Sequence, residues 1–158
     1  MRYLMVDAIT ELDGGVRAAG VKNAAMSEDY FADHFPQQPI VPGVLVLESM
    51  VQLARWLVIV GSEFTTTAVL SGVAQGKFID FAVPGDRLSV EVDSRDGVVV
   101  PAAGIDLEFR GTAQAHGRKI ATATFRCRTH PLAEFDDPAR VRKQYGVLRL
   151  NGAKAGGQ

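Results

Sequence analysis

The sequence predicts an α+β fold in which an antiparallel sheet wraps around one long central helix. Residues 44–60 form an almost continuously apolar segment that is long enough for several helical turns and ends at Gly61-Ser62. Two strand-like runs precede this segment and four follow it. Because a helix that is apolar on all sides must be covered on all sides, we expect the sheet to enclose it.

Alternating hydrophobicity and turn residues mark the individual strands. Residues 4–12 and 16–21 flank the turn signal Asp13-Gly14-Gly15, so they predict a hairpin. Residues 26–31 predict a short helical turn. The later strands are expected at residues 68–78, 87–94, 105–115 and 119–128, separated by Gly-containing turns such as Pro84-Gly85-Asp86.

The length of 158 residues fits a single domain with a tail. We expect the domain to cover residues 1–130, and a C-terminal extension to cover residues 131–158. The extension is mostly polar, which predicts one short helix at residues 138–145 and disorder at residues 151–158.

Composition excludes several classes of protein. The net charge of −1 lacks the basic surplus that nucleic-acid binding requires. Cys127 is the only cysteine, so no intrachain disulfide can form, and a reducing compartment is the simpler expectation. The apolar run at the N-terminus is too short for a signal peptide, which makes the cytoplasm the default location. Glu48, Gln52 and Arg55 lie inside the apolar helix and argue against a membrane span.

The segment from Asp33 to Gln52 carries the candidate chemistry. His34 is followed by three prolines within seven residues, which stiffen the loop up to the start of the helix. Gly43 follows directly, so its amide can approach a ligand closely at the electropositive end of a helix. Glu48 places an acid inside the apolar helix. A base, an acid and an oxyanion donor within twenty residues indicate proton transfer at a carbonyl compound.

Two motifs follow one another along the chain. The first comprises His34-Phe35-Pro36, Pro39, Pro42-Gly43-Val44-Leu45, Glu48 and Gln52, and the second comprises Lys77-Phe78 with Val83-Pro84-Gly85-Asp86-Arg87-Leu88. In this order they resemble the motifs of the beta-hydroxyacyl-[acyl-carrier-protein] dehydratases of type II fatty acid synthesis. Weaker similarity extends from Arg2 to about Arg128.

The resemblance implies a hotdog fold and dehydration of a (3R)-3-hydroxyacyl thioester, carried by acyl carrier protein, to the trans-2-enoyl thioester. It assigns His34 as the base that removes the C2 proton and Glu48 as the acid that protonates the departing C3 hydroxyl. The Gly43 amide stabilises the thioester oxygen. His34 and Glu48 of one site would come from different protomers of a homodimer or trimer of dimers. No cofactor, metal, nucleic acid or membrane is implied.

Other interpretations stay open at this stage. His116 and His130 lie at turns and are expected to be ordinary surface or core residues. Glu48 could form an ion pair with Arg55 in place of a catalytic role, and Gln52 could orient Glu48 or be merely structural. A hotdog thioesterase would use a helix carboxylate without needing His34. A non-catalytic acyl-binding subunit would keep the fold alone.

Two positions depart from the family pattern. Asp33 replaces the usual Gly before the histidine, and it would favour the charged form of His34 and weaken it as a base. Arg55 replaces a small residue and lies on the same helix face as Glu48, about 10 Å further along. We expect Val44, Gln52 and Arg55 to contact the substrate. Arg55 would then favour short or polar acyl groups over long saturated ones.

Overall fold

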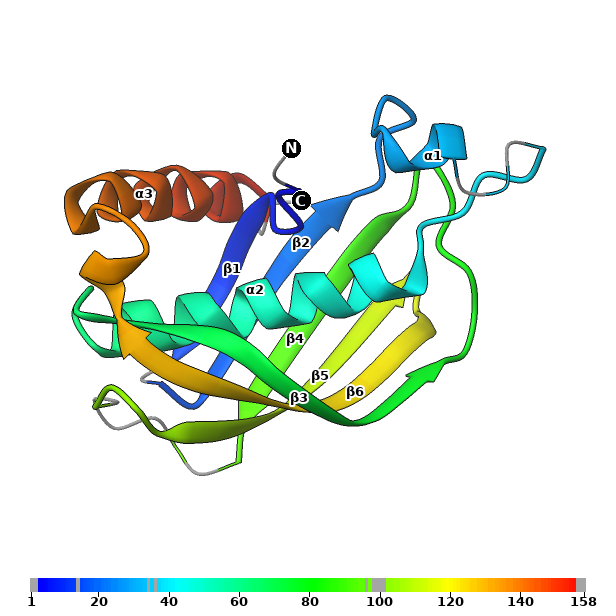
Figure 1. Ribbon diagram of the computed structural model, residues 1–158. Helices are drawn as coiled ribbons and strands as arrows, with labels where there is room; N and C mark the ends of the chain where they lie inside the picture. Colours follow the sequence, from blue (N-terminus) through cyan, green and yellow to red (C-terminus); the bar gives the residue numbers. More distant parts are fainter. Residues whose placement is uncertain are drawn as a thin grey trace.

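The structure is a computed structural model that describes residues 3–13, 15–33, 35, 37–95, 97 and 102–155. Within them, one antiparallel sheet of six strands curves around a long helix, α2, as Figure 1 shows. The elements in chain order are β1 (Ala8–Asp13), β2 (Arg17–Asn23), α1 (Tyr30–Asp33), α2 (Gly43–Gly61), β3 (Thr66–Phe78), β4 (Arg87–Ser94), β5 (Asp106–Ala115), β6 (Arg118–Pro131), the 3-10 turn η1 (Leu132–Glu134) and α3 (Pro138–Ala155).

The strands follow the order β1-β2-β4-β5-β6-β3, and every neighbouring pair is antiparallel. The predicted fold class is therefore confirmed, including the hairpin, which is β1–β2. The pairing of β3 with β6 contains two register shifts, between Leu70 and Gly72 and between Val73 and Gln75. Such irregularities bend and twist strands, and here they lie in the two longest strands, which curve around α2.

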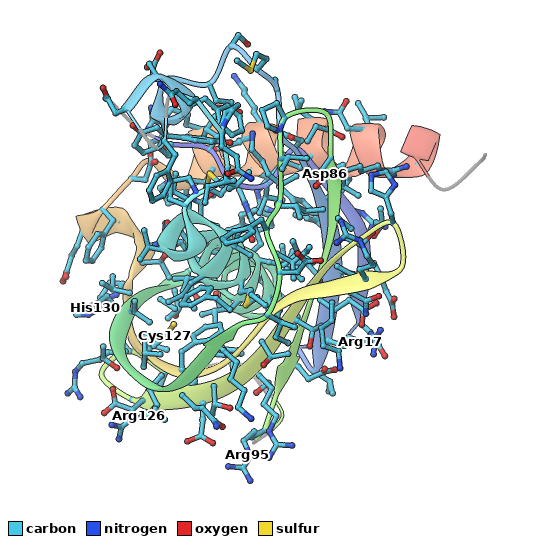
Figure 2. All side chains as sticks on the ribbon, turned by 90° about the vertical axis from the view of Figure 1, so that its right-hand side faces the viewer. Arg17, Asp86, Arg95, Arg126, Cys127 and His130 are labelled. Carbon is cyan, nitrogen blue, oxygen red and sulfur yellow. The ribbon has the colours of Figure 1, made fainter. Side chains whose placement is uncertain are left out.

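The core lies between α2 and the concave face of the sheet. Met50, Leu53 and Leu57 of α2 are fully buried and face inward-pointing residues of the strands. Burying each such side chain contributes roughly 1.5–3 kcal/mol. The strands alternate as the pleat requires: in Figure 2, Cys127 of β6 points inward and Arg126 points outward.

Helix α2 is long and apolar enough to cross a membrane on length and composition alone. In the fold, however, it packs against β2, β3, β4, β5 and β6, and 56% of its most apolar window is buried. It is therefore the core helix of a globular domain.

The C-terminal extension differs from the expectation. Helix α3 does not end at Tyr145 but continues to Ala155, so residues 151–155, expected to be disordered, are helical. The physical reason is tertiary packing that a polar sequence does not reveal. Val141 and Leu148 are buried, and the Nδ2 of Asn151 donates to the Asp7 carbonyl at 3.2 Å. Residues 156–158 lie outside the described residues.

Helix α3 lies alongside β1 at the edge of the sheet (Figure 1). The contact is closest at Gly152, where an added Cβ would lie 1.9 Å from the Ile9 carbonyl oxygen. The atoms it would meet belong to the backbone of a paired strand, which cannot move aside as a side chain could. The helix can therefore pack at this distance only with glycine at position 152.

The first prediction concerns this packing. Gly152→Ala should lower the free energy of unfolding by about 1–3 kcal/mol, because the new methyl group overpacks the α3–β1 contact. Gly146→Ala is the matched control in the same helix, since its Cβ would meet nothing within 4 Å. That change should stabilise the protein by about 0.5–1 kcal/mol through helix propensity. Guanidinium unfolding measures both, and two changes of the same sign would contradict the α3 packing.

Candidate active site

Four of the predicted site residues share one stripe of α2. Val44, Glu48, Gln52 and Arg55 are spaced four, four and three residues apart, which places them within about 80° around the helix. Most of the other side chains of α2 are buried, as Met50, Leu53 and Leu57 are. Val44 is 68% exposed and the other three are half-buried. These four residues form what we call the open stripe of α2.

Glu48 is held in place by Gln52. The Nε2 of Gln52 donates to the Glu48 Oε1 at 2.8 Å and to the Tyr3 carbonyl at 3.0 Å, and its Oε1 accepts from the Met5 amide at 2.9 Å. The side chain therefore connects the carboxyl group to the N-terminal segment. The hydrogen bond expected from the spacing of the two residues is present, and the Gln52 amide is fixed on both sides.

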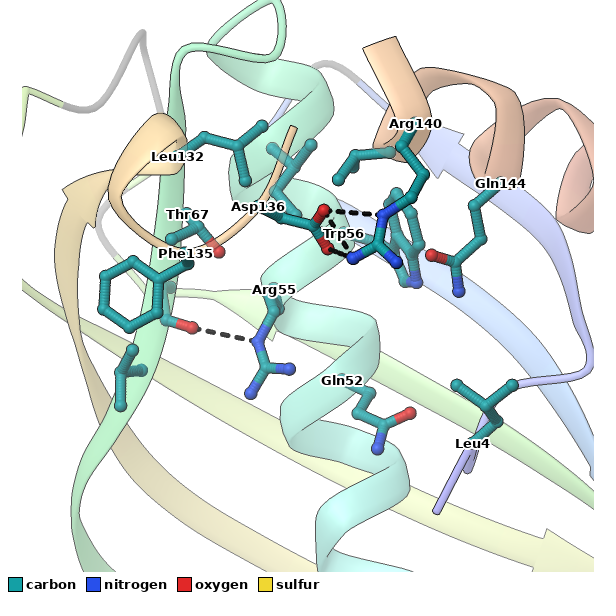
Figure 3. Close-up of a pocket in the computed structure, with 14 residues that line it drawn as sticks. Leu4, Gln52, Arg55, Trp56, Thr67, Leu132, Phe135, Asp136, Arg140 and Gln144 are labelled. Atoms are coloured by element: carbon teal, nitrogen blue, oxygen red, sulfur yellow. Dashed lines mark hydrogen bonds and ion pairs between the residues drawn. The ribbon is translucent and has the colours of Figure 1, made fainter. Parts of the chain in front are cut away.

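Arg55 does not pair with Glu48: the described residues contain no ion pair between them. Its Nε donates instead to the carbonyl of Ala68 on β3, at 3.0 Å. This bond directs the guanidinium toward β3. In Figure 3 a dashed line joins Arg55 to this carbonyl, and Arg55 lines the same cavity as Gln52 and Phe135.

This cavity has a volume of about 380 Å³ and lies at one end of the open stripe. Its walls come from α2, β3, η1, α3 and the N-terminal segment, so the C-terminal extension closes one side. The lining combines polar and apolar side chains: Leu4, Gln52, Arg55, Trp56, Ile59, Thr67, Ala68, Val69, Leu132, Phe135, Asp136, Arg140, Val141 and Gln144. We call it the Arg55 cavity. The walls from η1 and α3 were not predicted from the sequence, because their packing depends on long-range contacts.

The N-terminus of α2 leaves two amides available. Pro42 precedes the helix and provides no side-chain cap, and its carbonyl accepts from the amides of Leu45 and Val46. The amides of Gly43 and Val44 have no hydrogen-bond partner among the described residues. Unpaired amides at a helix N-terminus attract negative charge, which is what the predicted oxyanion role of Gly43 requires.

Gly43 also borders an apolar cavity of about 480 Å³. The ring of Phe78 lies so close that a Cβ on Gly43 would be 2.8 Å from its Cδ1. Several rings and aliphatic side chains surround this opening: Phe35, Ile40, Val41, Val44, Val46, Phe78, Ile79, Phe81, Ala82 and Ile120, together with Asp80. Neither Glu48 nor Gln52 lines it, so one chain does not bring the acid into the Gly43 cavity.

His34 lies outside the described residues, and its predicted role stays a prediction. The residue that follows it, Phe35, has a φ of 56°, a left-handed conformation that is uncommon for a bulky side chain. Such strained residues cluster at functional sites. The other histidines have contacts of their own: Nε2 of His116 lies 2.9 Å from Asp86 Oδ1, and the His130 ring packs on Phe135.

Cys127 is not a candidate nucleophile. Burial raises the pKa of this thiol to about 12, a rise that Arg55 counteracts and Glu48 reinforces. The thiolate, which is the reactive form, is therefore scarce at neutral pH.

The second prediction tests the Gln52 contacts. Gln52→Leu should lower the free energy of unfolding by about 1–3 kcal/mol, because it leaves the buried Met5 amide without an acceptor. Gln144→Leu is the matched control: Gln144 lines the same cavity, but its side chain makes no hydrogen bond within the described part of the chain. Its effect should stay within about 0.5 kcal/mol. Urea unfolding measures both variants, and an equal decrease in the free energy of unfolding for the two would contradict a specific role for Gln52.

Comparison with known proteins gives a consistent result. Residues 1–124 match the family described as the FabA-like domain. A 3-hydroxyacyl-[acyl-carrier-protein] dehydratase FabZ of Granulibacter bethesdensis is 38% identical over 126 residues, which cover 78% of this chain and 71% of that protein. The protein of the same name from Bacillus velezensis is 35% identical over 122 residues, which cover 77% of this chain and 83% of that protein.

Solved structures agree on the fold. The dehydratase heterocomplex ApeI:P from Xenorhabdus doucetiae matches with a TM-score of 0.57 and 20% identity, over 75% of this chain and 92% of that chain. A hypothetical thioesterase with coenzyme A from Streptococcus pneumoniae matches with a TM-score of 0.55 and 13% identity, over 78% of this chain and 84% of that chain. At these identities the likeness concerns the hotdog fold alone.

Proposed function

The chain belongs to the FabA-like family, and from this membership we propose that it dehydrates a (3R)-3-hydroxyacyl-[acyl-carrier-protein] thioester to the trans-2-enoyl thioester. The pathway would be fatty acid synthesis or a related polyketide or lipid pathway in the cytoplasm. The observation that carries the proposal is the open stripe, which presents a tethered carboxyl group on the uncovered face of the core helix.

The proposed reaction divides the work among three groups. His34 removes the proton from C2, and the developing negative charge on the thioester oxygen is stabilised by the Gly43 amide. The loss of one such donor typically costs about 3–4 kcal/mol. Glu48 then gives its proton to the hydroxyl that leaves from C3 as water. Gln52 positions Glu48 through its hydrogen bond, and no cofactor takes part.

We propose that the site is shared between two protomers of a homodimer, or of a trimer of dimers. Two observations support this. The acid is absent from the lining of the Gly43 cavity, so a single chain separates the oxyanion donor from the proton donor. The open stripe is also only partly covered, with Val44 68% exposed, and β3 at the edge of the sheet exposes Leu70 and Val73 by 38% and 46%. A second copy would supply both the cover and the missing group.

The third prediction concerns the reaction. His34→Asn and Glu48→Gln should each reduce the formation of enoyl thioester about 10²–10⁴-fold without loss of fold. The assay follows enoyl thioester and free thiol together, on acyl carrier protein and coenzyme A substrates. His116→Asn is the control for His34→Asn, because His116 packs at a turn, and Asn tolerates its φ of 50°.

The same assay separates the alternatives. A thioesterase would release free thiol and would tolerate His34→Asn, since its carboxylate needs no histidine. A non-catalytic acyl-binding protein would form neither product. Either result would overturn the proposed dehydratase activity.

The fourth prediction tests the shared site. His34→Asn and Glu48→Gln proteins are each inactive, but mixing them in equal amounts and allowing subunit exchange should restore about a quarter of wild-type activity. Half of the dimers then contain both variants, and each of these has one intact site of two. If each protomer held a complete site of its own, mixing would restore nothing. A monomer by light scattering would equally contradict the shared site.

A further inference from the structure

The Arg55 cavity contains a cationic group with unused hydrogen-bonding capacity. One donor of the guanidinium, Nε, is taken by the Ala68 carbonyl, and this bond fixes the orientation of the group. The two terminal nitrogens have no partner among the described residues. A guanidinium held in this way presents a rigid fork of parallel donors, the geometry that a carboxylate matches with two hydrogen bonds.

The other charges of the cavity cancel each other. Arg140 of α3 contacts both carboxylate oxygens of Asp136, through Nε at 2.8 Å and a terminal nitrogen at 2.6 Å. This pair leaves the positive charge of Arg55 without a counter-charge in the lining. The remaining polar groups at the wall, Thr67, Gln52 and Gln144, are neutral. The cavity is therefore electrostatically suited to an anion.

The cavity is also placed to receive the far end of a substrate. Gln52 lines the cavity and hydrogen-bonds Glu48, so the cavity begins beside the proposed proton donor. Arg55 lies seven residues beyond Glu48, about 10 Å along the helix. An extended chain advances roughly 1.2 Å per bond, by analogy with extended backbone, so this span corresponds to on the order of eight bonds.

We propose that the Arg55 cavity binds a carboxylate at the distal end of the acyl chain, which makes Arg55 a specificity-determining residue. The substrates would be 3-hydroxyacyl thioesters that end in a carboxyl group rather than a methyl group. This inference rests on the proposed dehydratase function and names its substrate class. The sequence alone led us to expect short or polar acyl groups. The inference narrows that expectation to a terminal carboxylate about 10 Å from Glu48 along the helix.

An alkyl tail is a poorer occupant for a physical reason. A methyl end in this cavity would displace water from the terminal nitrogens of Arg55 without giving them an acceptor, and stripping solvent from a charged group is costly. A carboxylate replaces the water with two charge-assisted hydrogen bonds. Because this contact is remote from the reacting carbons, it is made equally in the ground state and the transition state, and it should appear in KM.

The test compares pairs of 3-hydroxyacyl-acyl carrier protein substrates that have equal chain length and differ only in a terminal carboxylate or methyl group. With wild-type enzyme, the carboxylate substrate should have the lower KM, with the largest difference near the eight-bond length. Arg55→Met should raise its KM about ten- to a hundredfold, the usual effect of losing hydrogen bonds to a charged group. The KM of the methyl substrate should fall or stay unchanged. Arg55→Lys keeps the charge but lacks the pair of parallel donors. Its KM for the carboxylate substrate should therefore lie between the values of the wild type and of Arg55→Met.

Arg149→Met provides the matched control, since Arg149 is an exposed cation of α3 that does not line the cavity. It should leave both KM values unchanged. A wild-type enzyme that dehydrates the methyl substrate as well as or better than the carboxylate substrate would overturn the inference while keeping the dehydratase function. Failure to dehydrate either substrate would count against the proposed function itself. The wild-type comparison remains decisive even if Arg55→Met fails to fold.

Discussion

An apolar helix of nineteen residues must be removed from water, and a single sheet reaches only part of its circumference. The curvature of β3 and β6 extends the cover around α2, but it leaves one stripe open. Along that stripe lie the carboxyl of Glu48, the amide of Gln52 and the guanidinium of Arg55. The packing of the core thus determines where polar groups can be placed on this helix, and hence where the candidate site lies.

The two edges of the sheet differ in what covers them. At one edge, α3 packs along β1 so tightly that Gly152 touches the Ile9 backbone. At the other edge, β3 has 13 residues and pairs with β6 on one side only among the described strands. Exposed edge strands invite pairing with another chain. In the proposed dimer, the β3 edge is therefore the more accessible side for a second copy. The Arg55–Ala68 hydrogen bond links α2 to this strand.

The sequence predicted the features that depend on local periodicity. The bounds of α2 differ from the expected 44–60 by one residue at each end, and β4 has the expected bounds. The spacing of Glu48, Gln52 and Arg55 placed them on one face, as observed. A regular hydrophobic period and clear turn residues explain this success.

The features that the sequence did not predict depend on contacts between distant segments. The full length of α3 is stabilised by packing on β1 rather than by an amphipathic pattern, so a polar sequence suggested disorder. The anchoring of Gln52 to Tyr3 and Met5 joins residues that are 49 and 47 positions apart. The η1 and α3 walls of the Arg55 cavity have the same origin. No periodicity in a single segment encodes such contacts.

The arrangement of the open stripe also keeps two opposite charges apart. Arg55 lies on the same face as Glu48, one turn beyond Gln52, and an ion pair between them would favour the ionised carboxyl and oppose its use as a proton donor. Two sets of hydrogen bonds oppose that pair. Gln52, which is anchored to Tyr3 of the N-terminal segment, donates to the Glu48 carboxyl, and the Ala68 carbonyl holds the guanidinium toward β3. Each charged group is thereby left available to a ligand. In the proposed function, Glu48 acts at the reacting carbons of the substrate, and Arg55 binds its far end.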